Sequence, residues 1–266
     1  MKIGAPKWSL SDLRDSYEEF KDVYTQKPVH DNVGGMKAPH AFGAWFMMKT
    51  LQPKTIIESG VWKGQGTWLF EQACPSAKII CLDVNFSNLI YKSEKARYIE
   101  KDFSLINFEG IDKDSTICFF DDHQNALHRL TQMQWKGFKT AIFEDNYPAI
   151  RGDCYSLKKI FACAGFETEK TGFNGVKNQL KEFLQRIAKS SLNTVEANST
   201  HKTELINNLN LYYEFPPLFK EEKTRWGDAW SKEDYPTKDP IFDSDYTDAL
   251  RNEALHYSWM SLVELN

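Results

Sequence analysis

The chain has 266 residues, of which 41% are hydrophobic and 14% aromatic. It can therefore bury the core of one large α/β domain, or of one domain with an appended cap. The formal net charge of −4 gives no broad positive surface for nucleic acid. The longest apolar run, residues 41–48, is too short to span a bilayer, and the N-terminus lacks an apolar signal segment. We expect a soluble, cytoplasmic protein.

The five cysteines are odd in number and form no CxxC pair. Cys81 and Cys118 fall inside predicted buried strands. Free cysteine behaves as a small buried hydrophobe in a reducing compartment, so we expect free thiols and no disulfide framework.

Residues 1–51 precede the first predicted strand and form an N-terminal helical or lid segment. Ser11 and Asp12 are typical helix-capping residues and predict a helix that continues to about Tyr24. The glycine-containing stretch of residues 33–39 reads as a loop. A second helix is expected from His40 to Leu51, packed on the sheet.

The most informative segment is residues 55–67. Its first residues are apolar and β-branched, which suits a buried strand that ends at Glu58. Three glycines and an apolar run follow, so a glycine-rich turn and then a helix are expected. Strand, turn and helix in this order are the first unit of a nucleotide-binding α/β fold. The spacing is neither GxGxxG nor a phosphate loop, and a plain glycine-rich turn is the alternative interpretation.

Acidic residues follow one predicted strand after another. Residues 78–82 lead to Asp83, and a later acid stands at position 102. Residues 115–120 lead to Asp121, Asp122 and His123, and residues 140–143 lead to Glu144, Asp145 and Asn146. Ligands of open α/β sheets bind at the carboxyl ends of the strands, so this row of acids predicts a site there.

In this order of motifs the chain resembles the class I S-adenosylmethionine-dependent methyltransferases. Glu58-Ser-Gly-Val-Trp-Lys-Gly64 is similar to the first motif of the macrocin-type sugar O-methyltransferases, and Phe143-Glu-Asp-Asn-Tyr147 to their metal-binding strand end. Asp122-His123 and the Asp145-Asn146 pair resemble catechol-type enzymes. The likeness covers roughly residues 38 to 166. It implies a Rossmann-like, mostly parallel sheet with helices on both faces.

The resemblance implies S-adenosylmethionine as the cofactor. Glu58 and the turn at Gly60 would face its methionine end, Asp83 its ribose hydroxyls, and Asp102 with Phe103 its adenine. The other residues expected near the cofactor are Lys63, Gly64 and Asp121.

Methyl transfer requires an acceptor oxygen that is aligned with the methyl group and made nucleophilic. A hard divalent cation such as Mg²⁺ held by Asp122, Asp145 and Asn146 would do this, as would a base, Asp122 or His123. Several alternatives stay open. One of Asp121 and Asp122 could instead cap the helix near Gln124, and Glu144 could replace Asn146 as a ligand. Because the chain mixes macrocin-type and catechol-type features, the need for a metal is also open.

The pattern changes after residues 52–174, which form the predicted cofactor-binding core. Residues 175–266 are expected to form a helical or irregular cap, or to complete the sheet. A helix is predicted over residues 176–187, a loop over 190–203, and a strand or helix over 205–213. The end of the chain is aromatic and could cover the substrate side, a sheet edge or a dimer interface; its members are Trp226, Trp230, Tyr235, Phe242, Tyr246, Tyr257 and Trp259.

These observations predict an O-methyltransferase that acts on a hydroxyl of a small polar acceptor, with a sugar or glycan-related intermediate as first choice. His30, Asp31, Asn32 and His40 are the N-terminal residues expected at the acceptor pocket. The alternatives are a metal-independent enzyme acting on a phosphorylated or phenolic acceptor, and a non-catalytic Rossmann-like binding protein. No nucleic-acid or membrane partner is expected, and the sequence leaves homo-oligomerisation open.

Overall fold

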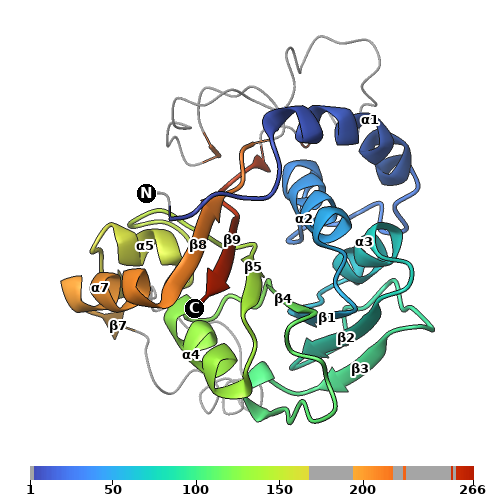
Figure 1. The fold of residues 1–266 in the computed structure, drawn as a ribbon. Coiled ribbons are helices and arrows are strands. Elements are labelled where there is room, and N and C mark those ends of the chain that lie inside the picture. The colour runs from blue at the N-terminus through green and yellow to red at the C-terminus, as the bar shows by residue number, and fades with distance from the viewer. Residues whose placement is uncertain (1–2, 168–193, 218–223, 226–252, 254–255) are drawn as a thin grey trace, which may run out of the picture.

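A mixed seven-stranded sheet with helices on both faces forms the centre of the molecule (Figure 1). This computed structural model describes residues 3–167, 194–217, 224–225, 253 and 256–266. The strand order is β3-β2-β1-β4-β5-β9-β8. The mostly parallel, Rossmann-like sheet expected from the sequence is confirmed.

The parallel part of the sheet holds five strands that alternate with helices along the chain. They are β1 (Thr55–Ser59), β2 (Lys78–Asp83), β3 (Arg97–Glu100), β4 (Thr116–Phe120) and β5 (Thr140–Phe143). In-register parallel pairing sets Ser59 of β1 beside Phe120 of β4, and Phe120 beside Phe143 of β5. The residues that follow these three strands therefore leave the sheet side by side.

The C-terminal segment completes the sheet. β9 (Ser261–Leu265) pairs antiparallel with β5, and β8 (Leu209–Glu214) pairs antiparallel with β9. α7 (Ser199–Asn208) leads directly into β8. The loop expected over residues 190–203 is thus partly wrong, because β7 (Thr194–Val195) and the first turns of α7 lie there. Asn198, whose side chain accepts a hydrogen bond from the backbone N–H of Thr200, starts that helix.

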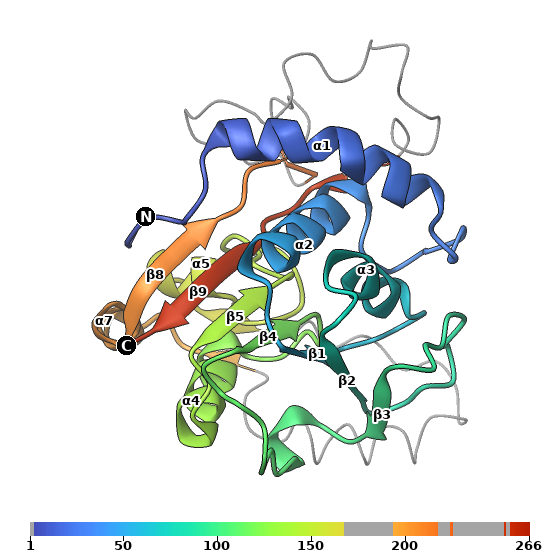
Figure 2. The same cartoon turned by 45° about the vertical axis from the view of Figure 1, so that its right-hand side comes forward.

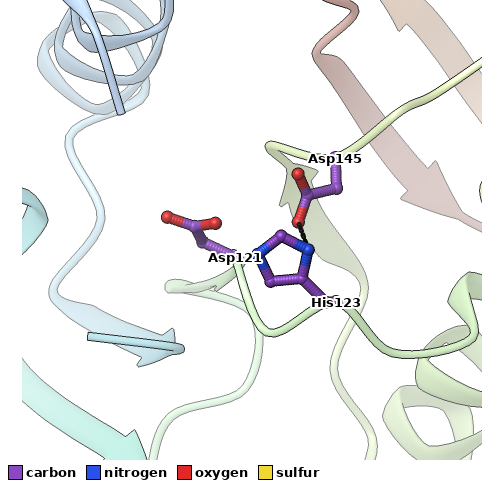
Figure 3. A group of neighbouring side chains, drawn as sticks. All are labelled: Asp121, His123 and Asp145. Carbon is purple, nitrogen blue, oxygen red and sulfur yellow. Dashed lines mark ion pairs between the residues drawn. The ribbon is translucent and has the colours of Figure 1, made fainter. Parts of the chain in front are cut away.

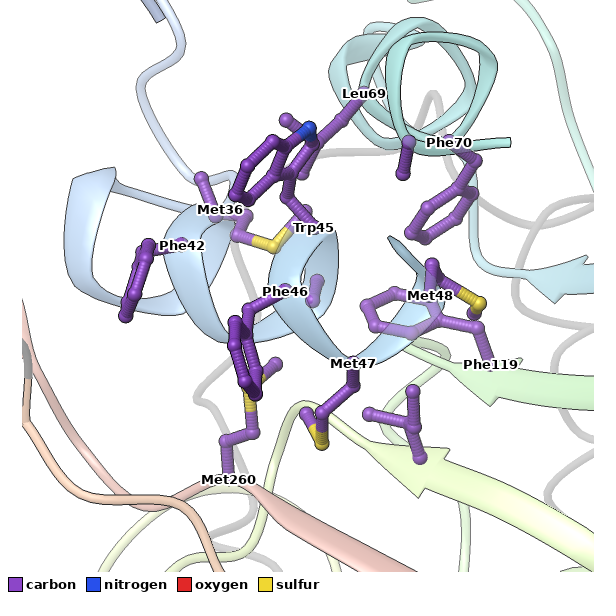
Figure 4. Packing of buried hydrophobic residues seen from close by; sticks show 14 of the residues in the cluster. Met36, Phe42, Trp45, Phe46, Met47, Met48, Leu69, Phe70, Phe119 and Met260 are labelled. Carbon is purple, nitrogen blue, oxygen red and sulfur yellow. The ribbon is translucent and has the colours of Figure 1, made fainter. Parts of the chain in front are cut away.

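Three helices cover one face of the sheet: α1 (Leu10–Thr25), α2 (Ala38–Leu51) and α3 (Gln65–Ala73). α2 is buried on nearly all sides, between α1 and the strands (Figure 2). Its large apolar side chains pack on α3, on β4 and on the end of the chain at Met260 (Figure 4). Alternate strand residues such as Ile56 and Phe119 face this layer.

The opposite face is covered by α4 (Ala126–Lys136), α5 (Leu157–Phe161) and α7. The intervening strand residues, among them Ile57, Cys118 and Phe120, belong to this second core. All five cysteines are free. Among the described residues, no helix combines the length and apolar character that crossing a bilayer requires.

The first helix begins earlier than expected, and part of the C-terminal segment lies outside the described residues. α1 begins at Leu10, two residues earlier than a Ser11 cap would allow, because Ser9 and Asp12 form a reciprocal capping box. The helix expected over residues 176–187 lies outside the described residues. So do five of the tail aromatics, whereas Tyr257 and Trp259 are buried in the structure.

Candidate functional site

The glycine-rich turn joins β1 to α3 at the carboxyl end of the sheet. Gly60 has φ +90°, and a Cβ added there would lie 2.0 Å from the carbonyl oxygen of Asp121. Only glycine therefore allows the exit of β1 to lie against the exit of β4. Gly64, with φ +87°, is the N-cap of α3 and lies against the carbonyl of Tyr91. The turn thus has the tight geometry that the glycine spacing predicts.

Glu58 is buried beneath this turn with 1% of its surface exposed. Its Oε2 accepts hydrogen bonds from the Thr67 hydroxyl and, at 3.4 Å, from the Cys81 thiol. Burial raises the pKa of the Glu58 carboxyl to about 8, and these hydrogen bonds only partly oppose it. Glu58 is therefore predominantly protonated at neutral pH and links β1 to α3.

Asp83, at the end of β2, binds the backbone of the turn. Its Oδ2 accepts from the N–H groups of Val61 at 2.9 Å and Trp62 at 3.4 Å, and its Oδ1 accepts from that of Asn85 at 3.1 Å. In this conformation Asp83 shapes the turn, and it is not among the residues that line the pocket beside it.

That pocket lies between the turn and the N-terminal loop of residues 28–37. Its walls include Asn32 and Met36 from the loop, Glu58 and Gln65 from β1 and α3, and Asp121 from the end of β4. Gly60 and Lys63 also line it. The cavity volume is about 10 Å³. Sequence-predicted residues from separate strands therefore do share one cavity.

Two buried amide side chains in this pocket are incompletely hydrogen-bonded. Among the described residues nothing pairs with Oδ1 of Asn32 or with Oε1 and Nε2 of Gln65. The two residues are only 4% and 3% exposed. Leaving buried amide groups unpaired costs free energy, so their presence points to a polar ligand.

In the part of the chain that the structure describes, two side-chain hydrogen bonds from the turn hold the loop closed over it. Nε1 of Trp62 donates to the carbonyl of Val33 at 3.0 Å, and Nζ of Lys63 donates to that of Asp31 at 2.5 Å. Lys63, predicted to bind the cofactor, thus holds the loop in this conformation.

Beside the pocket, Asp121, His123 and Asp145 form a cluster at the ends of β4 and β5 (Figure 3). One ligand atom from each lies within 4.8 Å of the others. His123 Nδ1 lies 3.4 Å from Asp145 Oδ2 and 2.8 Å from Oδ1 of Asp153. Within the described part of the chain, the buried Oδ2 of Asp145 has no hydrogen-bond partner. Two carboxylates and an imidazole at these distances can hold a divalent cation.

The charges in this cluster strongly influence one another. Burial and the neighbouring Glu144 raise the pKa values of both Asp121 and Asp145. Burial would lower the pKa of His123, but the hydrogen bond with Asp153 and the charges of Asp145 and Asp121 outweigh it and raise that pKa. The site therefore favours positive charge.

Glu144 lies beside Asp145 of the cluster and is paired with His40 of α2. The backbone N–H of Ser258 donates to His40 Nε2 at 3.0 Å, so Nδ1 carries the hydrogen that Glu144 accepts at 2.5 Å. Burial would raise the pKa of Glu144, but His40 outweighs it and lowers that pKa to about 2. His40, predicted near the acceptor, instead keeps Glu144 ionised.

Asp122 differs from the prediction that it faces the site. It accepts from Ser59 Oγ at 2.6 Å and pairs with Arg129 of α4 at 2.8 Å. Adjacent residues of an extended chain point in opposite directions, so turning Asp121 toward the pocket turns Asp122 toward α4. Asp122 also accepts from the backbone N–H of Gln124 at 3.2 Å, whereas the N-cap of α4 is Asn125.

Three more predicted residues have structural contacts in place of the expected ones. Asp102 accepts from both terminal nitrogens of Arg129, at 3.1 and 2.6 Å. Burial would raise its pKa, but Arg129 lowers it to about 2. Phe103 is fully buried among core aromatic rings. Asn146 donates to the Tyr212 hydroxyl and accepts from the backbone N–H of Lys158, which occupies both ends of its amide.

The sequence analysis missed Arg129 and Gln65. Arg129 is 3% exposed and shares one face of α4 with Ala126, Leu130 and Met133. A cation on the apolar face of a helix signals buried carboxylate partners, and that spacing is visible in the sequence. Gln65 stands in the first turn of α3, and nothing in its type distinguishes it from a surface residue.

No protein-family model and no curated protein matches the chain. Among solved structures, the O-methyltransferase TomG from Streptomyces achromogenes, involved in tomaymycin synthesis and in complex with SAM, is 9% identical, with 99% of this chain and 92% of that chain covered and a TM-score of 0.44. The SAH-bound Podospora anserina methyltransferase PaMTH1 is 13% identical, with coverages of 99% and 89% and a TM-score of 0.41.

The O-methyltransferase from Bacillus cereus in complex with SAH is 10% identical, with 98% of this chain and 92% of that chain covered and a TM-score of 0.42. At TM-scores this low, the activities of these proteins do not bear on this chain. Its function has to be inferred from its own residues.

The raised pKa of Glu58 makes stability depend on pH. Below about 4.5 the carboxyl is protonated in both states, whereas between about 4.5 and about 8 only the folded state keeps the proton. The stabilisation is thus lost as pH rises to about 8, by a few kcal/mol relative to Glu58→Gln. Urea unfolding of both proteins across this range measures the difference; parallel curves would contradict a buried, protonated Glu58.

Asp121→Asn and Asp122→Asn should have opposite effects on stability in the absence of divalent cations. Asp122→Asn weakens a buried pair with Arg129 and should lower the free energy of unfolding by about 2 kcal/mol. Asp121→Asn relieves like-charge repulsion with Asp145 and should leave that free energy unchanged or raise it. Chemical denaturation in a chelator compares them. The reverse ranking would mean that Asp122 is the residue facing the cluster.

Proposed function

We propose that this chain is an S-adenosylmethionine-dependent O-methyltransferase that acts on a hydroxyl of a small polar acceptor. One observation carries the proposal: Asp121 both lines the pocket beside the glycine-rich turn and belongs to the cluster with His123 and Asp145. A donor in the pocket and an acceptor at the cluster would therefore be neighbours, which in-line transfer requires.

The pocket chemistry suits the amino-acid end of the donor. The unpaired amides of Asn32 and Gln65 offer a donor and acceptors to an ammonium and a carboxylate group. Asp121 adds negative charge near the place where a cationic sulfonium would lie. The turn itself is built by Glu58, Gly60 and Gly64, which the sequence predicts near the cofactor.

The closed loop leaves too little room for the whole donor. The cavity of about 10 Å³ is far smaller than the few hundred Å³ that ligand sites commonly provide. In the described part of the chain, Trp62 and Lys63 each donate one exposed hydrogen bond to a loop carbonyl. Donor binding thus requires the loop of residues 28–37 to move outward, which those bonds oppose only weakly.

Asp121, His123 and Asp145 would hold a hard divalent cation, of which Mg²⁺ is the first candidate. Within the described chain Asp145 Oδ2 has no hydrogen-bond partner and lies 3.4 Å from His123 Nδ1. Together with the repulsion between the Asp121 and Asp145 carboxylates, this fits a cation at this place. When bound, such an ion lowers the pKa of a coordinated hydroxyl and fixes its position. Asp153 orients the imidazole of His123.

The acceptor is proposed to be a sugar or a glycan-related intermediate. His123 and Asp153, whose side chains are 45% and 68% exposed, form a polar outer rim of the cluster. Hydrogen-bonding groups of this kind suit a polyhydroxylated molecule. We also propose a cytoplasmic location, as expected from the sequence. Screening candidate acceptors for a mass increase of one methyl group tests the acceptor class.

Gln65→Leu should weaken the binding of S-adenosylhomocysteine about tenfold or more, because polar ligand groups would face an apolar side chain. Isothermal titration calorimetry measures the affinity, with Gln134→Leu, at an exposed position of α4, as the matched control. The control should bind like the unmodified protein. Absence of binding by the unmodified protein, or equal affinities of all three, would contradict the donor pocket.

Asp145→Asn should separate donor binding from turnover. The residue does not line the donor pocket, so the affinity for S-adenosylhomocysteine should stay within about twofold of the unmodified value. Methyl transfer should fall by about a hundredfold or more, and stimulation by Mg²⁺ should be lost. Retained stimulation by Mg²⁺ would remove Asp145 from the cation site and leave the donor proposal intact.

A further inference from the structure

The loop over the donor pocket has a compact internal structure. Asn32 Nδ2 donates to the Met36 carbonyl at 3.0 Å, and the Asn32 carbonyl accepts from the Gly35 N–H at 3.2 Å and from Lys37 Nζ at 2.8 Å. Hydrogen bonds within the loop therefore hold its middle together. If the loop moves outward to admit a ligand, it should move largely as a unit, and its two ends must absorb the change.

Both ends of this loop are bound by one side chain from the C-terminal part of the molecule. Glu253 accepts from Lys27 Nζ at 2.7 Å, just before the loop, and from the backbone N–H of Ala38 at 2.9 Å, just after it. It also accepts from the Tyr24 hydroxyl at 2.5 Å. A single carboxylate therefore connects the last turn of α1 with the first residue of α2.

The contact with Ala38 compensates for a missing helix cap. The N-cap of α2 is Lys37, whose side chain gives no capping hydrogen bond in the described structure. A carboxylate at a helix N-terminus both satisfies a free N–H and interacts favourably with the helix dipole. Glu253 supplies this from a position 215 residues away in the sequence.

The ion pair is shielded from solvent. The side chains of Lys27 and Glu253 are 7% and 13% exposed, and Lys27 also donates to the Tyr24 hydroxyl at 3.3 Å. Removing one partner of such a pair leaves the other charge buried and uncompensated, so the contact is lost as a unit.

We infer that Glu253 is a positioning residue that holds both ends of the pocket loop and thereby sets how readily a ligand enters the donor pocket. The inference rests on the proposed function, since it takes that pocket to bind S-adenosylhomocysteine. Glu253 keeps the ends of the loop fixed, while the Trp62 and Lys63 bonds close its middle. Loss of the carboxylate would loosen the ends and shift the loop toward open conformations.

Glu253→Gln tests this with the full chain and S-adenosylhomocysteine. Because the closed loop, which leaves too little room for the ligand, becomes less populated, the affinity should rise several-fold. The gain should appear as a faster association rate in stopped-flow or surface-plasmon measurements, with the dissociation rate nearly unchanged. Glu253→Asp, which keeps the charge, should bind more like the unmodified protein.

Glu214→Gln is the matched control. Glu214 accepts from Lys158 Nζ at 2.8 Å and from the Tyr212 hydroxyl at 2.7 Å, so it repeats the Lys–Glu–Tyr network outside the residues that line the pocket. Both variants should lower the melting temperature, but only Glu253→Gln should speed association. Equal association rates of the two variants would reduce Glu253 to a merely stabilising contact and overturn the inference.

Hydrogen exchange of the ligand-free protein distinguishes failure of this inference from failure of the proposed function. The amides of residues 31–37 should exchange faster in Glu253→Gln than in Glu214→Gln, whether or not any ligand binds. Faster exchange without binding of S-adenosylhomocysteine to the unmodified protein would retain the loop contact and reject the proposed ligand. Unchanged exchange would reject the role of Glu253.

Discussion

Like-charge repulsion at the carboxyl end of the sheet is the constraint on which the rest of the site depends. Parallel pairing of β1, β4 and β5 places their exits side by side, and each exit carries acidic residues. Protonation or a partner side chain offsets this repulsion at most of these acidic residues. Glu58 is held protonated, Glu144 is paired with His40, and Asp122 is paired with Arg129. Asp121 and Asp145 are left, with the imidazole of His123 beside them.

This division of partners separates structural acids from those available to a ligand. Arg129 joins the exits of β3 and β4 through Asp102 and Asp122, so these two carboxylates stabilise the scaffold. Asp145 keeps a buried oxygen without a hydrogen-bond partner in the described residues. A buried oxygen without a hydrogen-bond partner costs free energy unless a ligand pairs with it. This part of the sheet's carboxyl end is therefore the favoured place for a cation.

Much of the fold was predictable because its signals are local. Short apolar strands that end in acids, separated by helical segments, indicate a parallel sheet, and the three glycines mark the tight turn after β1. The antiparallel β8 and β9 were harder to predict, since their pairing joins segments far apart in the chain. Part of α7 was read as a loop because its residues are polar, and helix formation there depends on the Asn198 cap and on packing of Leu205.

The site was predictable as a region but not residue by residue. Asp121 and Asp122 are adjacent and chemically identical, so only the direction in which β4 ends decides which faces the pocket. Asn146 resembles a metal ligand in sequence, yet Tyr212 and Lys158 from other elements occupy its amide. Glu253 and Gln65 acquire their roles only through long-range contacts, which no local pattern reveals.

The central claim is that a donor pocket and a cation site adjoin through Asp121. The most direct test is the nuclear magnetic resonance signal of the S-adenosylmethionine methyl protons when Mn²⁺ and the protein are both present. The account predicts strong paramagnetic broadening of that signal, abolished in Asp145→Asn while the donor still binds. Binding of both Mn²⁺ and S-adenosylmethionine without broadening would show two separate sites and contradict the account.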